Sequence, residues 1–294
     1  MAIEPQHYLS VGATLGEGPL WHAGALWFTD IKERLLYRHR PGALLERWPA
    51  PDQIGWVQPA ADGTMIAGLK SGLHAFDPGT GGFTPLVAIE PDRPGNRLND
   101  STVDPLGRLW FGSMDDAEAE PSGAIYRADQ RGIVRAIDGI CITNGPALSP
   151  DARMLYHCDT LGGTIWRCDL DGDGGIADAR VFASVDVLTQ GYPDGPIVDA
   201  EGFLWVGFFG GWCVRRYAAD GRQVEEVRFP VANVTKIVIG GADGRTAFAT
   251  TASKGLGAEE RARQPMAGDV FTFAAGVAGQ PATPVSTPTF TLIG

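Results

Sequence analysis

The sequence predicts an all-β fold, and three observations lead to that prediction. Glycine and proline together supply 61 of the 294 residues, a share well above the roughly 12% that is usual, so turns are many and helices few. Short alternating runs of apolar and polar residues recur along the chain, as in half-buried strands. The turns between them are spaced 39 to 50 residues apart, the repeat length of a propeller blade. We therefore expect a six-bladed β-propeller with four-stranded antiparallel blades.

The repeating unit contains a strand, a tight turn, an aromatic-rich strand and a third strand. In the first unit the strands are 19–21, 25–30 and 34–38, and the turn is 22–24. Hairpin turns of this kind need residues with positive φ, which explains the glycines and Asp-Gly pairs. The six turn positions are Gly24, Gly63, Gly107, Ala152, Gly202 and Gly244. An open pair of β-sandwiches would not explain this sixfold period.

The chain shows no boundary that would divide it. No linker rich in Pro and Ser, and no block of charge, interrupts the repeats. We therefore expect residues 1–294 to form one propeller domain. The segment 8–11 precedes the first unit, and we expect it to supply an outer strand that closes the last blade.

Composition excludes several classes of partner. The net charge is −11 and there is no cluster of Lys or Arg, so neither nucleic acid nor an anionic membrane surface would be attracted. No apolar run approaches the ~20 residues of a membrane helix, and no signal peptide is evident at the N-terminus. We expect a cytoplasmic protein whose four cysteines are reduced, buried thiols.

Four polar residues occupy equivalent places in the repeat. Each opens the first strand of its unit, ten or eleven residues before a fixed position in the middle strand, and they are Glu17, Asn99, Asn144 and Asp194. Three of them begin the tripeptides Glu-Gly-Pro, Asn-Gly-Pro and Asp-Gly-Pro. The first strands of propeller blades line the central channel, so these side chains should meet at one of its mouths.

Two carboxylates and two amides at one mouth form an all-oxygen ligand set for a hard or borderline divalent cation. A cation would also remove the repulsion between the carboxylates. The alternative is that these tripeptides serve only as turns, since Asn and Asp favour turns.

Arg97 lies two residues before Asn99, so strand alternation directs it to the same mouth, where a guanidinium suits an oxygen-rich or anionic ligand. A surface arginine paired with a local acid is the other interpretation.

The segments around these residues resemble the regucalcin/gluconolactonase family, also called the senescence marker protein family, and are closest to its bacterial sugar-acid lactonases. The resemblance extends from about residue 12 to residue 275. It rests on motifs at separated places, which are Leu15–Trp21, Asn96–Asp100, Ile142–Pro146 and Tyr192–Gly195. Ser101 departs from the family pattern, because many members have Gly there.

The resemblance implies a six-bladed propeller that binds one divalent metal ion, such as Ca²⁺, Zn²⁺, Mn²⁺ or Fe²⁺. By motif, Glu17, Asn144 and Asp194 would be the metal ligands, and Arg97 and Asn99 would bind the substrate. The implied activity is hydrolysis of an aldonic acid lactone, with a sugar lactone as the small-molecule partner. In this mechanism metal-activated water attacks the lactone, and Asp194 is the catalytic base.

Two other function classes are open. A non-catalytic, calcium-binding regulatory propeller of the regucalcin type would use the same ligands. A propeller hydrolase for aryl esters or organophosphates would be expected to have more carboxylates and a catalytic histidine. The five histidines show no metal or triad spacing, and no Gly-x-Ser-x-Gly motif occurs, so a serine hydrolase is not expected.

Overall fold

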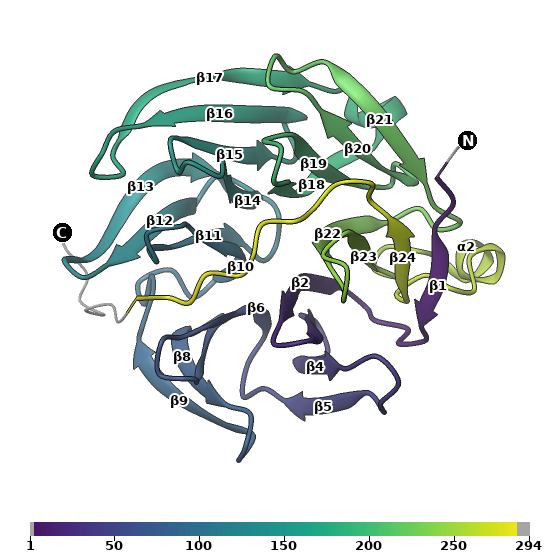
Figure 1. Cartoon of the computed structure of the whole chain (residues 1–294), viewed down its shortest axis with the longest axis horizontal. Helices are drawn as coiled ribbons and strands as arrows, with labels where there is room; N and C mark the ends of the chain where they lie inside the picture. The colour runs from purple at the N-terminus through teal and green to yellow at the C-terminus, as the bar shows by residue number, and fades with distance from the viewer. Residues whose placement is uncertain (1–2, 287–294) are drawn as a thin grey trace.

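The computed structural model describes residues 3–286, and its β-sheets are arranged radially around one axis (Figure 1). Residues 1–2 and 287–294 of the expected domain lie outside the described residues. Within each sheet, paired strands that are consecutive in the sequence are antiparallel. They follow one another outward from the axis. Strands nearest the axis are mostly buried, whereas outer strands such as β9 (Gly82–Val87) are largely exposed. The architecture is an all-β propeller.

Four sheets are separate four-stranded blades. The first contains β2 (Gly16–His22), β3 (Ala25–Asp30), β4 (Leu35–His39) and β5 (Glu46–Pro49). The second contains β6 (Ile54–Pro59), β7 (Met65–Leu69), β8 (Gly72–Asp77) and β9. The third contains β10 (Asn96–Val103), β11 (Leu109–Asp115), β12 (Gly123–Asp129) and β13 (Gly132–Ile140). The fourth contains β14 (Thr143–Leu148), β15 (Met154–Asp159), β16 (Thr164–Leu170) and β17 (Ile176–Ser184).

The remaining strands form one sheet of eight, in the order β1-β24-β23-β22-β18-β19-β20-β21. They are β1 (Gln6–Leu9), β18 (Tyr192–Val198), β19 (Leu204–Phe209), β20 (Cys213–Tyr217), β21 (Gln223–Arg228), β22 (Val234–Gly240), β23 (Thr246–Thr251) and β24 (Val270–Ala274). The N-terminal strand β1 pairs antiparallel with β24, which makes it the outer strand at that end.

The prediction of six four-stranded blades is therefore wrong: the structure has four such blades, and the eight-stranded sheet takes the place of the other two. A parallel pairing of Gly195 with Lys236 joins β18 to β22. A Cβ atom at Gly195 would lie 2.6 Å from the Lys236 side chain, so the glycine permits this close approach. The spacing of the turns could not predict this pairing between β18 and β22. That spacing indicates hairpins within a unit and carries no information about pairing between units.

The C-terminal segment crosses the ring. After β24 the chain runs across the centre of the molecule in Figure 1. Gln280 Nε2 donates hydrogen bonds of 2.9 Å to the carbonyl oxygens of Leu148 and Val198. Further along, Val285 forms a parallel bridge with Ala60. The segment thus links sheets that are far apart in the sequence.

Among residues 3–286, helix is confined to two short connections. They are α1 (Val187–Gln190), which begins after the N-cap Asp186, and α2 (Ala258–Arg263). Neither helix is long or apolar enough to cross a membrane. Of the cysteines, Cys158, Cys168 and Cys213 are buried free thiols, as expected, whereas Cys141 is partly exposed.

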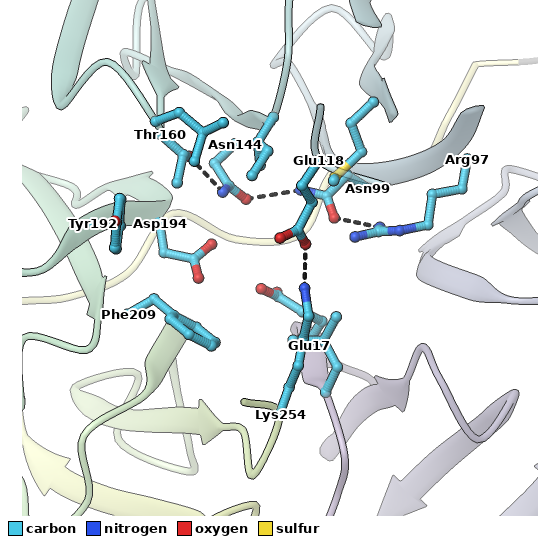
Figure 2. Close-up of a pocket in the computed structure, with 14 residues that line it drawn as sticks. Glu17, Arg97, Asn99, Glu118, Asn144, Thr160, Tyr192, Asp194, Phe209 and Lys254 are labelled. Carbon is cyan, nitrogen blue, oxygen red and sulfur yellow. Dashed lines mark hydrogen bonds and ion pairs between the residues drawn. The ribbon is translucent and has the colours of Figure 1, made fainter. Parts of the chain in front are cut away.

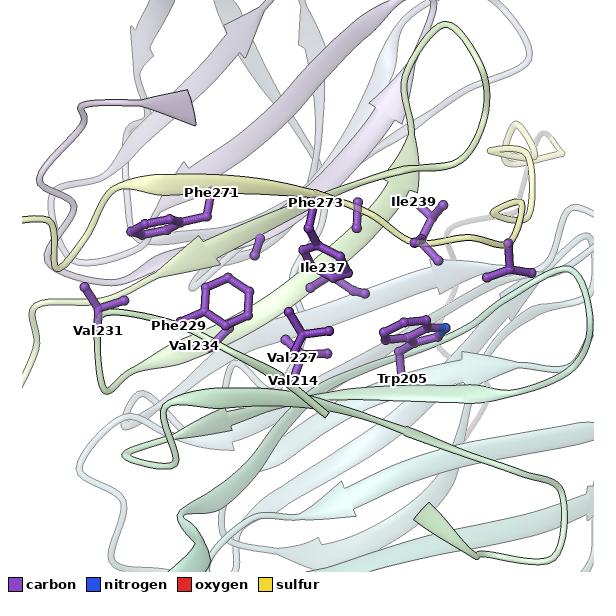
Figure 3. Close-up of a cluster of buried hydrophobic side chains, with 14 of the residues drawn as sticks. Trp205, Val214, Val227, Phe229, Val231, Val234, Ile237, Ile239, Phe271 and Phe273 are labelled. Atoms are coloured by element: carbon purple, nitrogen blue, oxygen red, sulfur yellow. The ribbon is translucent and has the colours of Figure 1, made fainter. Parts of the chain in front are cut away.

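Apolar side chains fill the spaces between neighbouring groups of strands. Figure 3 shows one such cluster, in which Trp205 and Val214 face Phe271 and Phe273. Phe229 meets both phenylalanines edge to face, with ring centroids 5.8 and 6.0 Å apart, a favourable aromatic geometry. Packing of this kind holds the inner strands at fixed positions around the axis.

His157 in β15 gives the fold a specific acid sensitivity. The ring is stacked on Trp166, and its Nδ1 has no hydrogen-bond partner among residues 3–286. Burial lowers the pKa of His157 from 6.5 to about 4. Between these values the unfolded chain binds more protons, so the stabilisation is complete above pH 6.5 and is lost as the pH falls toward 4.

Replacing His157 with Phe should remove this acid sensitivity while keeping an aromatic ring against Trp166. Between pH 7.5 and pH 5 we expect the native protein to lose about 2 kcal/mol more unfolding free energy than His157→Phe. Urea unfolding at both pH values measures the difference. Equal losses in the two proteins would contradict the assignment to His157.

Candidate functional site

The strands nearest the axis share an irregularity. The inner strands β2, β6, β10, β14, β18 and β22 contact one another in a closed ring. In each of these strands the pairing register with the hairpin partner shifts once, between two paired residues that are two or three positions apart. Bulges of this kind bend a strand and redirect its side chains. Four of these shifts include or adjoin the residues singled out from the sequence, Glu17, Asn99, Asn144 and Asp194.

Glycine follows three of these four residues for a steric reason. Gly18 has a φ of +55°, and a Cβ atom there would lie 2.4 Å from the carbonyl oxygen of Gly55 on the next inner strand. A side chain at Gly18 would therefore push β2 away from β6. The Gly-Pro pairs lie within strands β2, β14 and β18, at the register shifts and not in hairpin turns. They let the inner backbones approach closely enough for the preceding side chains to converge.

All five site residues predicted from the sequence line one cavity of about 250 Å³. Figure 2 shows Asp194 and Glu17 directed toward its centre, with Asn144 above them and Asn99 and Arg97 to one side. All five are buried, and none is more than 6% exposed. Residues from β2, β10, β14 and β18, more than 170 positions apart at the extremes, thus share one small pocket.

The carboxylates of Glu17 and Asp194 are buried without a cationic partner. Glu17 Oε2 accepts a hydrogen bond of 3.0 Å from its neighbour's backbone, Gly18 N–H, and neither acid forms an ion pair among residues 3–286. Burial, followed by the charge of Asp100, raises the pKa of Glu17 to about 7. Burial and then the charges of Glu17 and Asp100 raise the pKa of Asp194 well above its usual range. Two acids held in this way favour a proton or a cation between them.

Asn99 connects the other polar residues of the pocket. Its Nδ2 donates to Asn144 Oδ1 at 2.9 Å and to the carbonyl oxygen of Thr143 at 2.7 Å. Its Oδ1 accepts a hydrogen bond of 2.5 Å from Arg97 Nη1. Asn144 Nδ2 in turn donates to Thr160 Oγ1 at 2.9 Å. With both N–H groups of Asn99 engaged, only its Oδ1 has a free lone pair for a ligand.

Arg97 is held by a carboxylate from a neighbouring connection. Its Nε donates to Asp116 Oδ1 at 2.9 Å, and the arginine side chain is 3% exposed. Lys32 and Gln53, from connections of two other sheets, also donate to Asp116. Burial favours a higher pKa, but the bond from Lys32 and the charge of Arg97 bring the pKa of Asp116 down to about 2. Arg97 thus pairs with a local acid, but it is buried and lines the pocket, so it is not the surface arginine of the alternative interpretation.

Nine further residues line the pocket and were not predicted from the sequence as site residues. Four of them are Leu15, Met114, Ile142 and Leu161, and the other five are Glu118, Thr160, Tyr192, Phe209 and Lys254. Glu118 and Lys254 form an ion pair across the mouth (Figure 2). The signal that could have found these two is loop length, since residues 116–122 and 252–269 are the longest second-to-third-strand connections. Tyr192 and Phe209 give the opposite side an aromatic wall.

A buried ion pair beneath the pocket was also missed. Lys236 Nζ donates to Asp100 Oδ1, and the two side chains are 6% and 2% exposed. Asp100 and Lys236 occupy equivalent positions in their repeat units. Three other units have glycine at this position, directly after the residue at the bulge. Nothing in the local sequence indicates that they pair, because they are 136 residues apart.

Comparison with known proteins identifies the family to which this fold and pocket belong. Residues 15–253 match the model of the SMP-30/gluconolactonase/LRE-like region. An L-arabinolactonase of Azospirillum brasilense is 36% identical over 266 residues, covering 88% of this chain and 87% of the relative. A 6-deoxy-6-sulfogluconolactonase of Pseudomonas putida is 30% identical over 272 residues, covering 91% and 93%. The chain belongs to the SMP-30/gluconolactonase family.

A solved structure supports the same assignment. Regucalcin from Agrobacterium tumefaciens, described as a calcium-binding protein, superposes with a TM-score of 0.91 at 27% identity. The alignment covers 97% of this chain and 98% of that one. The family recognised from the four motifs is therefore confirmed over nearly the whole length of the chain.

Replacing Asp116 with Ala should destabilise the protein by leaving the buried Arg97 guanidinium without its carboxylate. We expect the free energy of unfolding to fall by about 3 kcal/mol, as for other buried pairs that lose one partner. Glu120→Ala is the matched control, because it removes an exposed carboxylate from the same connection and should cost less than about 0.5 kcal/mol. Urea unfolding compares the variants, and similar losses in both would contradict this role of Asp116.

Proposed function

We propose that the chain hydrolyses a sugar lactone to the free aldonic acid, with a divalent metal ion bound by Glu17, Asn144 and Asp194. The names of the lactonase relatives support the reaction class. The observation that carries the proposal is the pair of buried, uncompensated carboxylates facing Arg97 and Asn99 within one small cavity. Its volume of about 250 Å³ suits a ligand smaller than a typical drug.

The residues present fit a divalent cation. Among residues 3–286 no three His, Cys, Asp or Glu side chains form a metal-binding group, so the two carboxylates need help from an amide. Asn144 Oδ1 supplies a neutral oxygen and has a second lone pair beyond the one that accepts from Asn99. Carboxylate and amide oxygens suit Ca²⁺ or Mn²⁺, and carboxylates also bind Zn²⁺. When bound, such an ion would polarise the lactone carbonyl and make its bound water more acidic.

Asp194 is the group that would take the proton in the reaction. The oxygen of water forms a bond to the lactone carbonyl carbon, and one water proton passes to the Asp194 carboxylate. The bond between that carbon and the ring oxygen then breaks, and the ring oxygen receives the proton as a hydroxyl group. The product is an open-chain aldonic acid, and Asp194 is again ionised.

Arg97 would orient the substrate. Its Nε and Nη1 are engaged with Asp116, Leu98 and Asn99. Within the described residues Nη2 donates no hydrogen bond, which leaves it for a substrate oxygen or the developing oxyanion. Asn99 would hold the side chains of Arg97 and Asn144 in fixed relative positions. Its remaining Oδ1 lone pair would accept a hydrogen bond from a sugar hydroxyl.

Acid release from a panel of pentono- and hexonolactones tests the proposal. The protein is first stripped of metal with a chelator and then supplied with Ca²⁺, Mn²⁺, Fe²⁺ or Zn²⁺. We expect stripping to abolish lactone opening and at least one of these ions to restore it. A protein that binds Ca²⁺ but opens no lactone faster than buffer would instead be a regulatory propeller, and the enzymatic proposal would be wrong.

Asp194→Asn tests the proposed base with little change in shape. We expect kcat/KM to fall about 10²- to 10⁴-fold, the usual contribution of a general base. Asp186→Asn is the matched control, because Asp186 lies outside the pocket at the N-cap of α1, where Asn caps equally well. A steady-state assay and a thermal melt on each variant separate lost catalysis from lost folding. Retained activity in folded Asp194→Asn would exclude Asp194 as the base.

A further inference from the structure

The ion pair between Asp100 and Lys236 spans the central axis below the pocket. Asp100 lies on β10 and Lys236 on β22, which are on opposite sides of the ring of inner strands. Neither residue lines the pocket itself. Lys236 lines a second cavity of about 390 Å³, which is formed by residues further along the inner strands and by the C-terminal segment 279–283. The pair therefore lies between the two cavities.

Asp100 is tied to the ligand-bearing segment of β14 as well as to Lys236. Its Oδ2 accepts a hydrogen bond of 2.9 Å from the backbone N–H of Gly145, the residue that follows Asn144. Its Oδ1 accepts from Ser101 N–H at 2.7 Å and from Lys236 Nζ. On the other side of the ring, the Lys236 side chain packs on Gly195, next to Asp194. Each member of the pair thus touches the backbone beside a proposed metal ligand.

Both charged groups are almost fully buried. Asp100 and Lys236 are 2% and 5% exposed, and charges act over longer distances in such surroundings than at a surface. The charge of Asp100 acts on Glu17 and Asp194, and that of Lys236 acts on Glu17. The two charges act in opposite directions on Glu17, where the effect of Asp100 is the larger, and together they make the ion pair neutral. Removal of one would leave a full buried charge facing any cation bound above.

We propose that Asp100 and Lys236 are positioning residues that form a charge-balanced floor, and that this balance sets the affinity of the pocket for its divalent cation. The inference rests on the metal site proposed above. Loss of the Asp100 charge alone would leave an ammonium group opposing the cation. Loss of both charges together would restore the balance, even though the hydrogen bonds of Asp100 would remain altered.

A double-mutant cycle tests this inference, with binding of Mn²⁺ to metal-stripped protein measured by titration calorimetry at pH 8. We expect Asp100→Asn to weaken binding about 10- to 100-fold, the usual effect of an altered outer-shell group. Lys236→Met should bind at least as tightly as the native protein. Asp100→Asn/Lys236→Met should return to within about threefold of the native affinity, because the two charge effects are coupled.

The double variant distinguishes charge balance from simple structural support. If the pair acted only by holding Gly145 in place, adding Lys236→Met could not repair the Asp100→Asn defect. A double variant as weak as Asp100→Asn would therefore overturn the inference. Should Asp100→Asn fail to fold, Lys236→Met is compared with Lys236→Arg, which keeps the charge, and weaker binding by Lys236→Met would overturn it. Absence of Mn²⁺ and Ca²⁺ binding by the native protein would overturn the metal site and this inference together.

Discussion

The close packing of the inner strands around one axis is the constraint on which the pocket depends. Gly18, Gly145 and Gly195 leave no room for a Cβ atom, which would lie 2.4 to 2.9 Å from a neighbouring strand. The bulges beside them direct the preceding side chains inward. Burial of carboxylates is costly unless a counter-charge is present. Packing and chemistry are thus coupled, because the geometry that closes the ring also concentrates negative charge at its centre.

The surrounding hydrogen bonds make this concentration of charge an ordered site. Asn99 lies between Arg97 and Asn144, so one amide aligns a cationic group and a neutral oxygen. Asp116 holds Arg97 and accepts hydrogen bonds from Lys32 and Gln53, which lie on two other connections. These contacts restrain the side chains, because each member of the network is hydrogen-bonded to at least one other member. Residues from several connections around the pocket therefore fix the positions of the proposed reacting groups.

Much of the site could be predicted because its residues repeat in phase with the strands. Glu17, Asn99, Asn144 and Asp194 occur at equivalent places in four units, and all four line the cavity. Glu118 and Lys254 could not be assigned in this way, because they lie on connections whose paths do not follow the repeat. The pairing of Asp100 with Lys236 could not be predicted, because neither residue indicates a partner by itself. Only closure of the ring brings β10 and β22 to opposite sides of one axis.

The sequence by itself determined the all-β propeller class, the family and five of the residues that share the pocket. Strand period, turn chemistry and motif spacing are local properties. Only the tertiary structure decided how the sheets join. The pairing of Gly195 with Lys236 unites eight strands, where the repeat predicted two separate blades. Tertiary structure also decided which charges balance one another. Electrostatic energy depends on distance and burial, and residues 136 positions apart meet only after the ring has closed.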